Sequence, residues 1–267
     1  MIKSYLSLVG FLGFSSIASS QAVVLSNWTD FSTNTDATFV GNGNDGFVRG
    51  MAVNSTGSAA TGAESSFDSD VTLGVGESLQ FDFTMTDIVI QQAQNNVGFR
   101  VGFENISADS ALDATIHFVF SSGGGVIGRF GGASGSANPY SQGTLFDSTN
   151  YTGATSIATG PGPIDISVSL TLLGVNGSDP SLFDYEASIL WDGVTNGPST
   201  VFTRNTDTWN SVYVLTNNNA AFGLAGDTYT IGGAAVSVIP EPSSAPLVMS
   251  ALAMIGVLAA IRRRRMS

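Results

Sequence analysis

The chain has 267 residues, of which 43% are hydrophobic and only 11% are charged, against about 25% charged residues in ordinary soluble domains. Its formal net charge is −12, from 9 Lys and Arg against 21 Asp and Glu. A nucleic-acid-binding surface needs clustered Lys and Arg to neutralise phosphates, so this charge balance excludes nucleic acid as an expected partner. The low charge content also argues against a cytosolic NTPase or dehydrogenase.

The N-terminus, residues 1–22, has the pattern of a secretory signal peptide. Lys3 precedes a short, mostly apolar run from Tyr5 to Ile17, and small residues follow that run. The run is too short to span a bilayer comfortably. We expect signal peptidase to cleave after Ala22, and cleavage after Ser20 is the alternative.

The middle of the chain, residues 23–239, alternates apolar and polar residues, which is the pattern of half-buried antiparallel β-strands. The clearest strands are expected at Leu79–Met85, Val97–Phe103, Ala114–Phe120, Ile164–Leu172 and Phe183–Trp191. Further strands are expected at Phe47–Val53, Val126–Phe130, Ser211–Leu215, Ala221–Ala225 and Thr228–Val238. No segment has convincing helical periodicity, and Asp87–Asn96 fits a helix and a loop equally well.

Clusters of Gly, Asn, Ser and Asp between these runs have the chemistry of turns, as in residues 41–46, 176–180 and 192–193. Residues 121–143 and 149–162 are expected to form long loops. Many strands without helices predict an all-β fold, namely an antiparallel two-sheet sandwich of the jelly-roll type.

The middle domain also resembles a known class of proteins. The strand pair Leu79–Met85 and Val97–Phe103, and the run from Phe222 to Ile231, are similar to concanavalin A-like lectin/glucanase sandwiches. This resemblance concerns the architecture, and an architecture does not by itself imply a function.

The domain between the two ends is strongly acidic. Residues 23–239 contain four Arg against 20 acids, a net charge of −16. Such a surface repels anionic polymers and attracts divalent cations. Calcium binds roughly 6–8 oxygen atoms, so we consider a structural calcium ion held by oxygen ligands in or near loops. Neither group of candidates has the spacing of an EF-hand: Asn42, Asn44 and Asp45 form one group, and Asp68 and Asp70 form the other.

No motif predicts catalysis. Asp184 and Glu186 point to the same face of one strand, but a solvated strand face explains them better than a glycosidase pair. His117 is the only His and there is no Cys, which excludes a zinc cluster of His and Cys. Residues 123–128 match Gly-x-Gly-x-x-Gly, but the sequence after them cannot begin the helix that a dinucleotide site requires.

The three tryptophans are the aromatic residues considered for stacking on a sugar. Trp191 falls in the apolar phase of its strand, so we expect it in the core. Trp28 and Trp209 stand in polar sequence contexts and are the candidate sugar-binding residues, although packing in the core is the favoured role for both.

The C-terminal segment, residues 240–267, contains three features in a fixed order. The triplet Pro240, Glu241 and Pro242 comes first, an apolar run from Leu247 to Ile261 follows, and the last feature is a basic tail of Arg262, Arg263, Arg264 and Arg265. As a helix the run spans about 22 Å, which is marginal against a hydrocarbon core of about 30 Å. Flanking residues extend it to a predicted transmembrane helix over residues 246–261. The basic tail places that end in the cytoplasm.

This order of features resembles the PEP-CTERM sorting signal of Gram-negative bacteria. The resemblance implies processing near the motif by a membrane protease of the exosortase type, and it implies bacteria that make an extracellular polysaccharide. The sequence therefore predicts a non-catalytic, exported protein that is held in the inner membrane in transit and then lies at the cell surface or in the extracellular matrix. A carbohydrate-binding, lectin-like module is the alternative, and a polysaccharide hydrolase or lyase is less favoured.

Overall fold

A computed structural model of the chain describes residues 19–32, 35–54, 60–89, 99–105, 116–120, 126–130, 142–144, 162–196, 201–217 and 224–241. Residues Ser20–Ile239 form one compact unit, and Met1–Ser19 with Pro240–Ser267 form a second unit. The predicted signal peptide and transmembrane segment lie almost entirely outside the described residues. No helix in the described ranges is long and apolar enough to cross a membrane.

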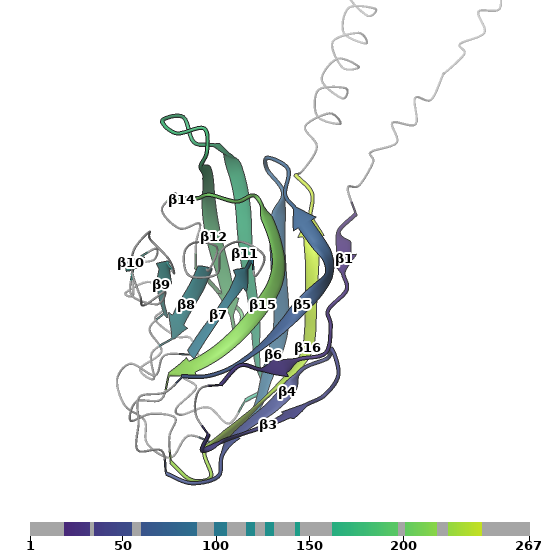
Figure 1. The fold of residues 1–267 in the computed structure, drawn as a ribbon, viewed down its shortest axis with the longest axis vertical. Helices are drawn as coiled ribbons and strands as arrows, with labels where there is room; N and C mark the ends of the chain where they lie inside the picture. The colour runs from purple at the N-terminus through teal and green to yellow at the C-terminus, as the bar shows by residue number, and fades with distance from the viewer. Residues whose placement is uncertain are drawn as a thin grey trace, which may run out of the picture. The chain divides into compact units, whose positions relative to one another are not determined.

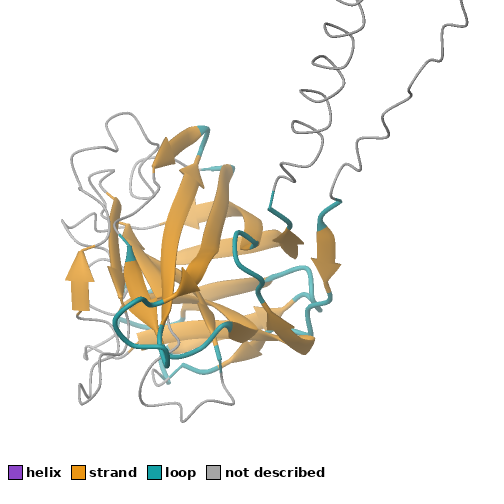
Figure 2. Ribbon diagram, turned by 90° about the horizontal axis from the view of Figure 1, so that it is seen from above, coloured by secondary structure: helices purple, strands orange, loops and turns teal. Residues whose placement is uncertain are grey.

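The described residues form sixteen β-strands in two sheets and no helix (Figure 2). The nine-stranded sheet has the order β13-β12-β11-β6-β16-β4-β3, with β1 beside β16 and β14 beside β12. Its strands are β1 (Gln21–Val23), β3 (Ala37–Gly41), β4 (Phe47–Met51), β6 (Ser78–Val89), β11 (Ile164–Val175), β12 (Phe183–Trp191), β13 (Val194–Asn196), β14 (Phe202–Arg204) and β16 (Thr228–Ile239).

The seven-stranded sheet has the order β10-β9-β8-β7-β15-β5-β2. Its strands are β2 (Thr29–Asp30), β5 (Ala60–Thr72), β7 (Phe99–Glu104), β8 (Ile116–Phe120), β9 (Val126–Phe130), β10 (Gln142–Thr144) and β15 (Thr208–Asn217). In Figure 1 the strands β7, β15 and β5 lie in front of β6, β11 and β16. Neighbouring strands run antiparallel in both sheets, so the predicted all-β fold with two antiparallel sheets is confirmed.

The core lies between the two sheets and follows from the alternation in the sequence. In β6 the apolar residues from Leu79 to Met85 are buried at every second position, while the polar residues between them are partly exposed. β11 continues this layer, because Val168 pairs with Phe81. The seven-stranded sheet contributes Phe103 and Trp209, whose rings meet edge to face with their centroids 6.5 Å apart.

Two turns show why particular residues are required. Asp192 and Gly193 link β12 to β13 with φ angles of 47° and 78°, and two successive positive φ angles are those of a type I′ hairpin turn, for which Asp-Gly is a preferred pair. This turn was expected from the sequence. Gly46 closes the β3–β4 hairpin against β16, where a Cβ would overlap the carbonyl oxygen of Ile231. A larger residue there would push the hairpin away from the sheet.

Several expected elements differ from the structure. β12 and β9 have the predicted bounds, but the long strand β5 was not predicted, because Ala60–Thr72 is rich in Ser, Asp, Gly and Thr. Residues 87–89 of the helix-or-loop segment belong to β6, and the rest of that segment lies outside the described residues. Leu224 and Ala225 lie in a turn rather than in the predicted strand over 221–225.

Candidate functional site

The strongest candidate site lies on the face of the seven-stranded sheet that points away from the core. β15 lies between β5 and β7 (Figure 1), and its Tyr213 pairs with Glu64 on β5, while its Ser211 pairs with Glu104 on β7. The residues beside these on each strand belong to the core: Ala63, Phe103, Val212 and Val214. The alternation of a strand therefore directs Glu64, Tyr213 and Glu104 to the outer face, and two carboxylates flank β15.

These two carboxylates lie in an environment that disfavours their charge. Burial raises the pKa of Glu104 to about 7, and the negative charge of Glu64 contributes to the increase. Burial also raises the pKa of Glu64. No described residue donates a hydrogen bond to either carboxylate, and none forms an ion pair with it. Like charges kept together without a neutralising partner cost stability, and such perturbed groups concentrate at functional sites.

An aromatic pair lies between and beside the carboxylates. Tyr213 is 2% exposed, so its ring presents no open face to a ligand, and it meets the Phe31 ring edge to face with the centroids 6.5 Å apart. Phe31 also lies over Gly62, where a Cβ would overlap the Phe31 ring. The register continues the row of Tyr213 through Gly102, His117 and Arg129 on β7, β8 and β9. The backbone positions of His117 and Arg129 thus belong to the same register row as Glu64 and Tyr213.

A buried arginine joins the two sheets beside this site. Arg49 of β4 is fully buried, and its guanidinium bonds both carboxylate oxygens of Asp30 on β2, at 2.9 and 3.2 Å. It also donates a hydrogen bond to the carbonyl oxygen of Gly62 on β5 and lies 5.0 Å from the centre of the Phe39 ring. Burial alone would raise the pKa of Asp30, but hydrogen bonds from Arg49 and Ser32 outweigh it and lower the pKa.

The tryptophans considered for sugar binding are core residues. Trp28 is 3% exposed and Trp209 is 0% exposed, so neither presents a ring face to a sugar. The indole nitrogen of Trp28 donates to the carbonyl oxygen of Asn44 at 3.3 Å, which explains its polar sequence context. Trp191 is buried as expected, at 2%.

The candidate calcium ligands form two separate groups with partners of their own. Asn42 donates to the carboxylate of Asp45 at 3.4 Å within the β3–β4 turn. Asp68 and Asp70 lie on β5 rather than in a loop, and Asp70 accepts a hydrogen bond from Asn210 at 3.3 Å. The described part of the chain contains no group of three or more His, Cys, Asp and Glu that could hold a metal. A calcium site stays a prediction.

The remaining candidates from the sequence lie on strands or next to them. Asp184 and Glu186 lie on β12 on either side of the buried Tyr185. Asp184 accepts a hydrogen bond from Asn176 at 2.7 Å, which agrees with the expected solvated strand face. The glycine motif leads into β9, a strand. Pro240 and Glu241 follow β16, whereas Pro242 and the basic tail lie outside the described residues.

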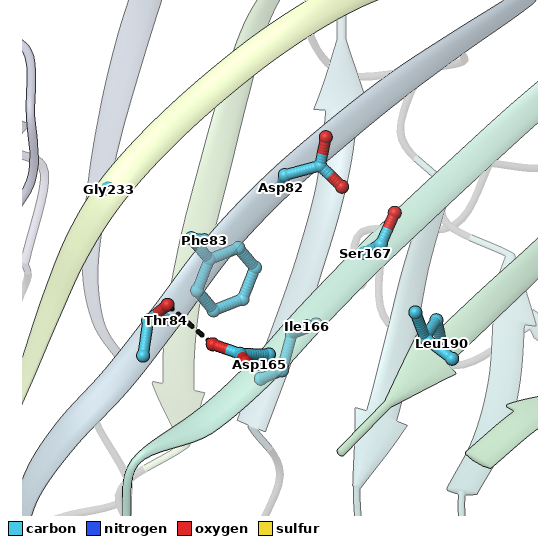
Figure 3. A pocket seen from close by; sticks show the side chains of 8 residues that line it. All are labelled: Asp82, Phe83, Thr84, Asp165, Ile166, Ser167, Leu190 and Gly233. Carbon is cyan, nitrogen blue, oxygen red and sulfur yellow. Dashed lines mark hydrogen bonds between the residues drawn. The ribbon is translucent and has the colours of Figure 1, made fainter. Parts of the chain in front are cut away.

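A hollow lies on the outer face of the nine-stranded sheet (Figure 3). It has a volume of about 210 Å³ and is lined by Asp82, Thr84, Asp165 and Gly233, among others. Its two carboxylates already have partners, because Thr84 donates to Asp165 at 2.7 Å and Gln80 donates to Asp82 at 2.9 Å. Glu64 and Glu104 on the other sheet have no such partner among the described side chains, so they are the stronger candidate.

The sequence reasoning did not select Glu64, Glu104 or Tyr213. A signal for Glu104 was present, since it continues the polar phase of Arg100 and Gly102 one residue beyond the predicted strand. Glu64 lies in β5, which had no recognisable pattern. Tyr213 lies in a strand that was predicted, but β15 is buried on both faces and shows no alternation there.

Among known proteins, no family model matches the chain, and no curated protein matches it. Solved structures do match. An endo-1,3-beta-glucanase from Streptomyces sioyaensis has 11% identity over 80% of this chain and 90% of its own, with a TM-score of 0.46. The alginate lyase vAL-1 from Chlorella virus has 13% identity over 81% of this chain and 92% of its own, with a TM-score of 0.45.

A legume lectin-like domain from Entamoeba histolytica has 7% identity over 80% of this chain and 90% of its own, with a TM-score of 0.42. These three neighbours are named as a glucanase, a lyase and a lectin-like domain. With TM-scores below 0.5 they assign neither a substrate nor a site to this chain.

Proposed function

We propose that this protein is an exported carbohydrate-binding protein whose jelly-roll sandwich binds a glycan on the outer face of the seven-stranded sheet. The observation that carries the proposal is the pair Glu64 and Glu104 on either side of β15, opposite Tyr213 and Ser211 respectively, with no neutralising partner among the described side chains. Carboxylates accept hydrogen bonds from sugar hydroxyls, and such bonds to a charged group are stronger than neutral ones. A ligand that donates these bonds would compensate for the electrostatic cost of the pair.

The charge of the domain supports a neutral glycan. A net charge of −16 over residues 23–239 repels anionic polymers, and the described side chains at the site are carboxylates and a phenol. Export and anchoring are supported by the two ends of the chain, namely the signal-like residues 1–22 and the PEP-CTERM-like order over residues 240–267. We place the protein at the cell surface or in the extracellular matrix, after processing by signal peptidase and an exosortase-type protease.

Replacing either carboxylate by its amide is expected to weaken glycan binding. Glu64→Gln and Glu104→Gln keep the size of the side chain but remove the charged acceptor, which contributes about 1.5–3 kcal/mol per hydrogen bond. We expect a loss of affinity of about tenfold or more for a neutral polysaccharide identified on a glycan array. Glu186→Gln, the same change on β12 of the other sheet, serves as the matched control. Equal binding by wild type and both site variants would overturn the proposal.

Cleavage of a polysaccharide is the second candidate function, and the pKa of Glu104 favours it. A carboxyl group with a pKa of about 7 is partly protonated at neutral pH and can give its proton to a glycosidic oxygen, as a general acid does. Glu64 would then act as the second carboxylate. We expect release of reducing ends from a bound glycan to fall by at least about 10²-fold in Glu104→Gln. A wild type that binds the glycan without releasing reducing ends contradicts this second function and leaves binding alone.

A further inference from the structure

The first strand of the domain begins at the residue that would follow the alternative signal cleavage site. Gln21, Ala22 and Val23 form β1 and pair with Val238, Ser237 and Val236 of β16. β4 covers only residues 228–231 of β16, so β1 is the neighbour that covers this end of β16 on the side opposite β6 (Figure 1). An exposed strand edge with unpaired backbone groups is a liability that β1 removes.

The chain remains paired without a break after β1. Asp68 donates its backbone N–H to the carbonyl oxygen of Val24 at 3.0 Å, and Ser26 donates to Ser66 at 2.8 Å. Leu25 forms an isolated bridge with Phe67 and is 6% exposed. Ser19 and Ser20, by contrast, are exposed and belong to no strand. The structured domain therefore starts at Gln21.

The two cleavage positions differ in where they leave the new amino group. A cut after Ala22 removes two of the three paired residues and places a charged ammonium on Val23, which packs against the core and pairs with the 2%-exposed Val236. A charge beside apolar surface is costly because it loses hydration. A cut after Ser20 keeps β1 whole and places the ammonium on Gln21, which is exposed.

We propose that signal peptidase hydrolyses the Ser20–Gln21 peptide bond, so that the mature chain begins at Gln21; this inference rests on the export proposed above. Water adds across the bond and leaves a carboxyl group on Ser20 and an amino group on Gln21. The sequence rule for small residues at the first and third positions before the cut is met by Ser20 and Ala18. That rule is equally met by Ala22 and Ser20, so the strand pairing is what separates the two positions.

The test uses the full chain, expressed in a Gram-negative host, with the N-terminal peptide of the exported form identified by mass spectrometry. Mass spectrometry is needed because an N-terminal glutamine that cyclises blocks chemical sequencing. Two matched variants separate the sites. Ala18→Phe places a bulky residue at the third position before the proposed cut only, and Ala22→Phe blocks only the cut after Ala22.

We expect the wild type and Ala22→Phe to begin at Gln21, and we expect Ala18→Phe to accumulate as uncleaved precursor. A wild type that begins at Val23, or an Ala18→Phe variant that is processed while Ala22→Phe is not, would overturn the cleavage site and leave export intact. An unprocessed wild type in the cytoplasmic fraction would instead contradict the proposed export itself, and the cleavage site with it.

Discussion

Asp30→Asn is expected to lower the free energy of unfolding by about 3–5 kcal/mol, because it leaves a buried guanidinium without its counter-ion. Arg49 is 0% exposed, whereas the side chain of Asp30 is 34% exposed. Asparagine keeps the size of Asp30 and one acceptor oxygen but cannot neutralise Arg49, whose other partners include the carbonyl of Gly62 and the ring of Phe39. Chemical denaturation followed by tryptophan fluorescence measures the loss.

The reciprocal change distinguishes an unpaired buried charge from a simple loss of packing. Arg49→Met fills a similar volume with an apolar side chain and leaves Asp30 partly exposed to water, so we expect it to cost less than Asp30→Asn. The double variant should recover much of the stability lost in Asp30→Asn. Asp68→Asn, at an exposed position of β5, should change stability by no more than about 0.5 kcal/mol. An effect of Asp30→Asn as small as that of this control would refute the argument.

Stability is also expected to fall as the pH rises from about 4.5 to about 7, because of Glu104. Its pKa is raised from 4.5 to about 7 in the folded state, so over this window the unfolded chain releases a proton that the folded chain keeps. The contribution of Glu104 is therefore fully present below the unfolded pKa and is lost as the pH rises through the folded pKa. At 1.36 kcal/mol per pKa unit, the loss is at most about 3 kcal/mol.

Glu104→Gln should remove this part of the pH dependence, because glutamine is neutral throughout the range and resembles the protonated carboxyl. The variant should consequently be more stable than the wild type at pH 8 and similar to it at pH 4. Glu64→Gln should reduce the slope partially, since the charge of Glu64 contributes to the raised pKa. Glu186→Gln on β12 of the other sheet should leave the slope unchanged. Parallel pH profiles of wild type and Glu104→Gln would show that Glu104 is not desolvated in solution.

The two stability predictions concern neighbouring parts of one structure. Arg49 bonds Gly62, and Gly62 is two residues from Glu64 on β5. Arg49 links β4 to β2 through its ion pair with Asp30 and to β5 through its hydrogen bond to Gly62, while Glu64 and Glu104 oppose stability on the outer face of the seven-stranded sheet. The ion pair therefore adds to the free energy of unfolding, and the glutamate pair lowers it. Proteins often tolerate such a loss of stability where a surface is retained for binding.

Much of the fold could be read from local pattern. β11 and β12 are predicted by strict alternation because each has one face in the core and one in water. The turn at Asp192 and Gly193 is predicted by the preference of Asp-Gly for positive φ. β5 could not be predicted in this way, since its small and polar residues carry little intrinsic preference for a strand. Its backbone is held by pairing with β15 and β2.

The sequence by itself determined the all-β class, the acidic charge and the expectation of export, because composition and periodicity are local properties of the chain. Only the tertiary structure placed Glu64 and Glu104 on the two sides of one strand, since β15, which pairs with both of their strands, lies far from both residues in the sequence. The tertiary structure also decided that Trp28 and Trp209 are core residues, because their burial depends on side chains from the opposite sheet that pack against them. The same long-range pairing, between β1 and β16, separates two cleavage positions that local residue size leaves equal.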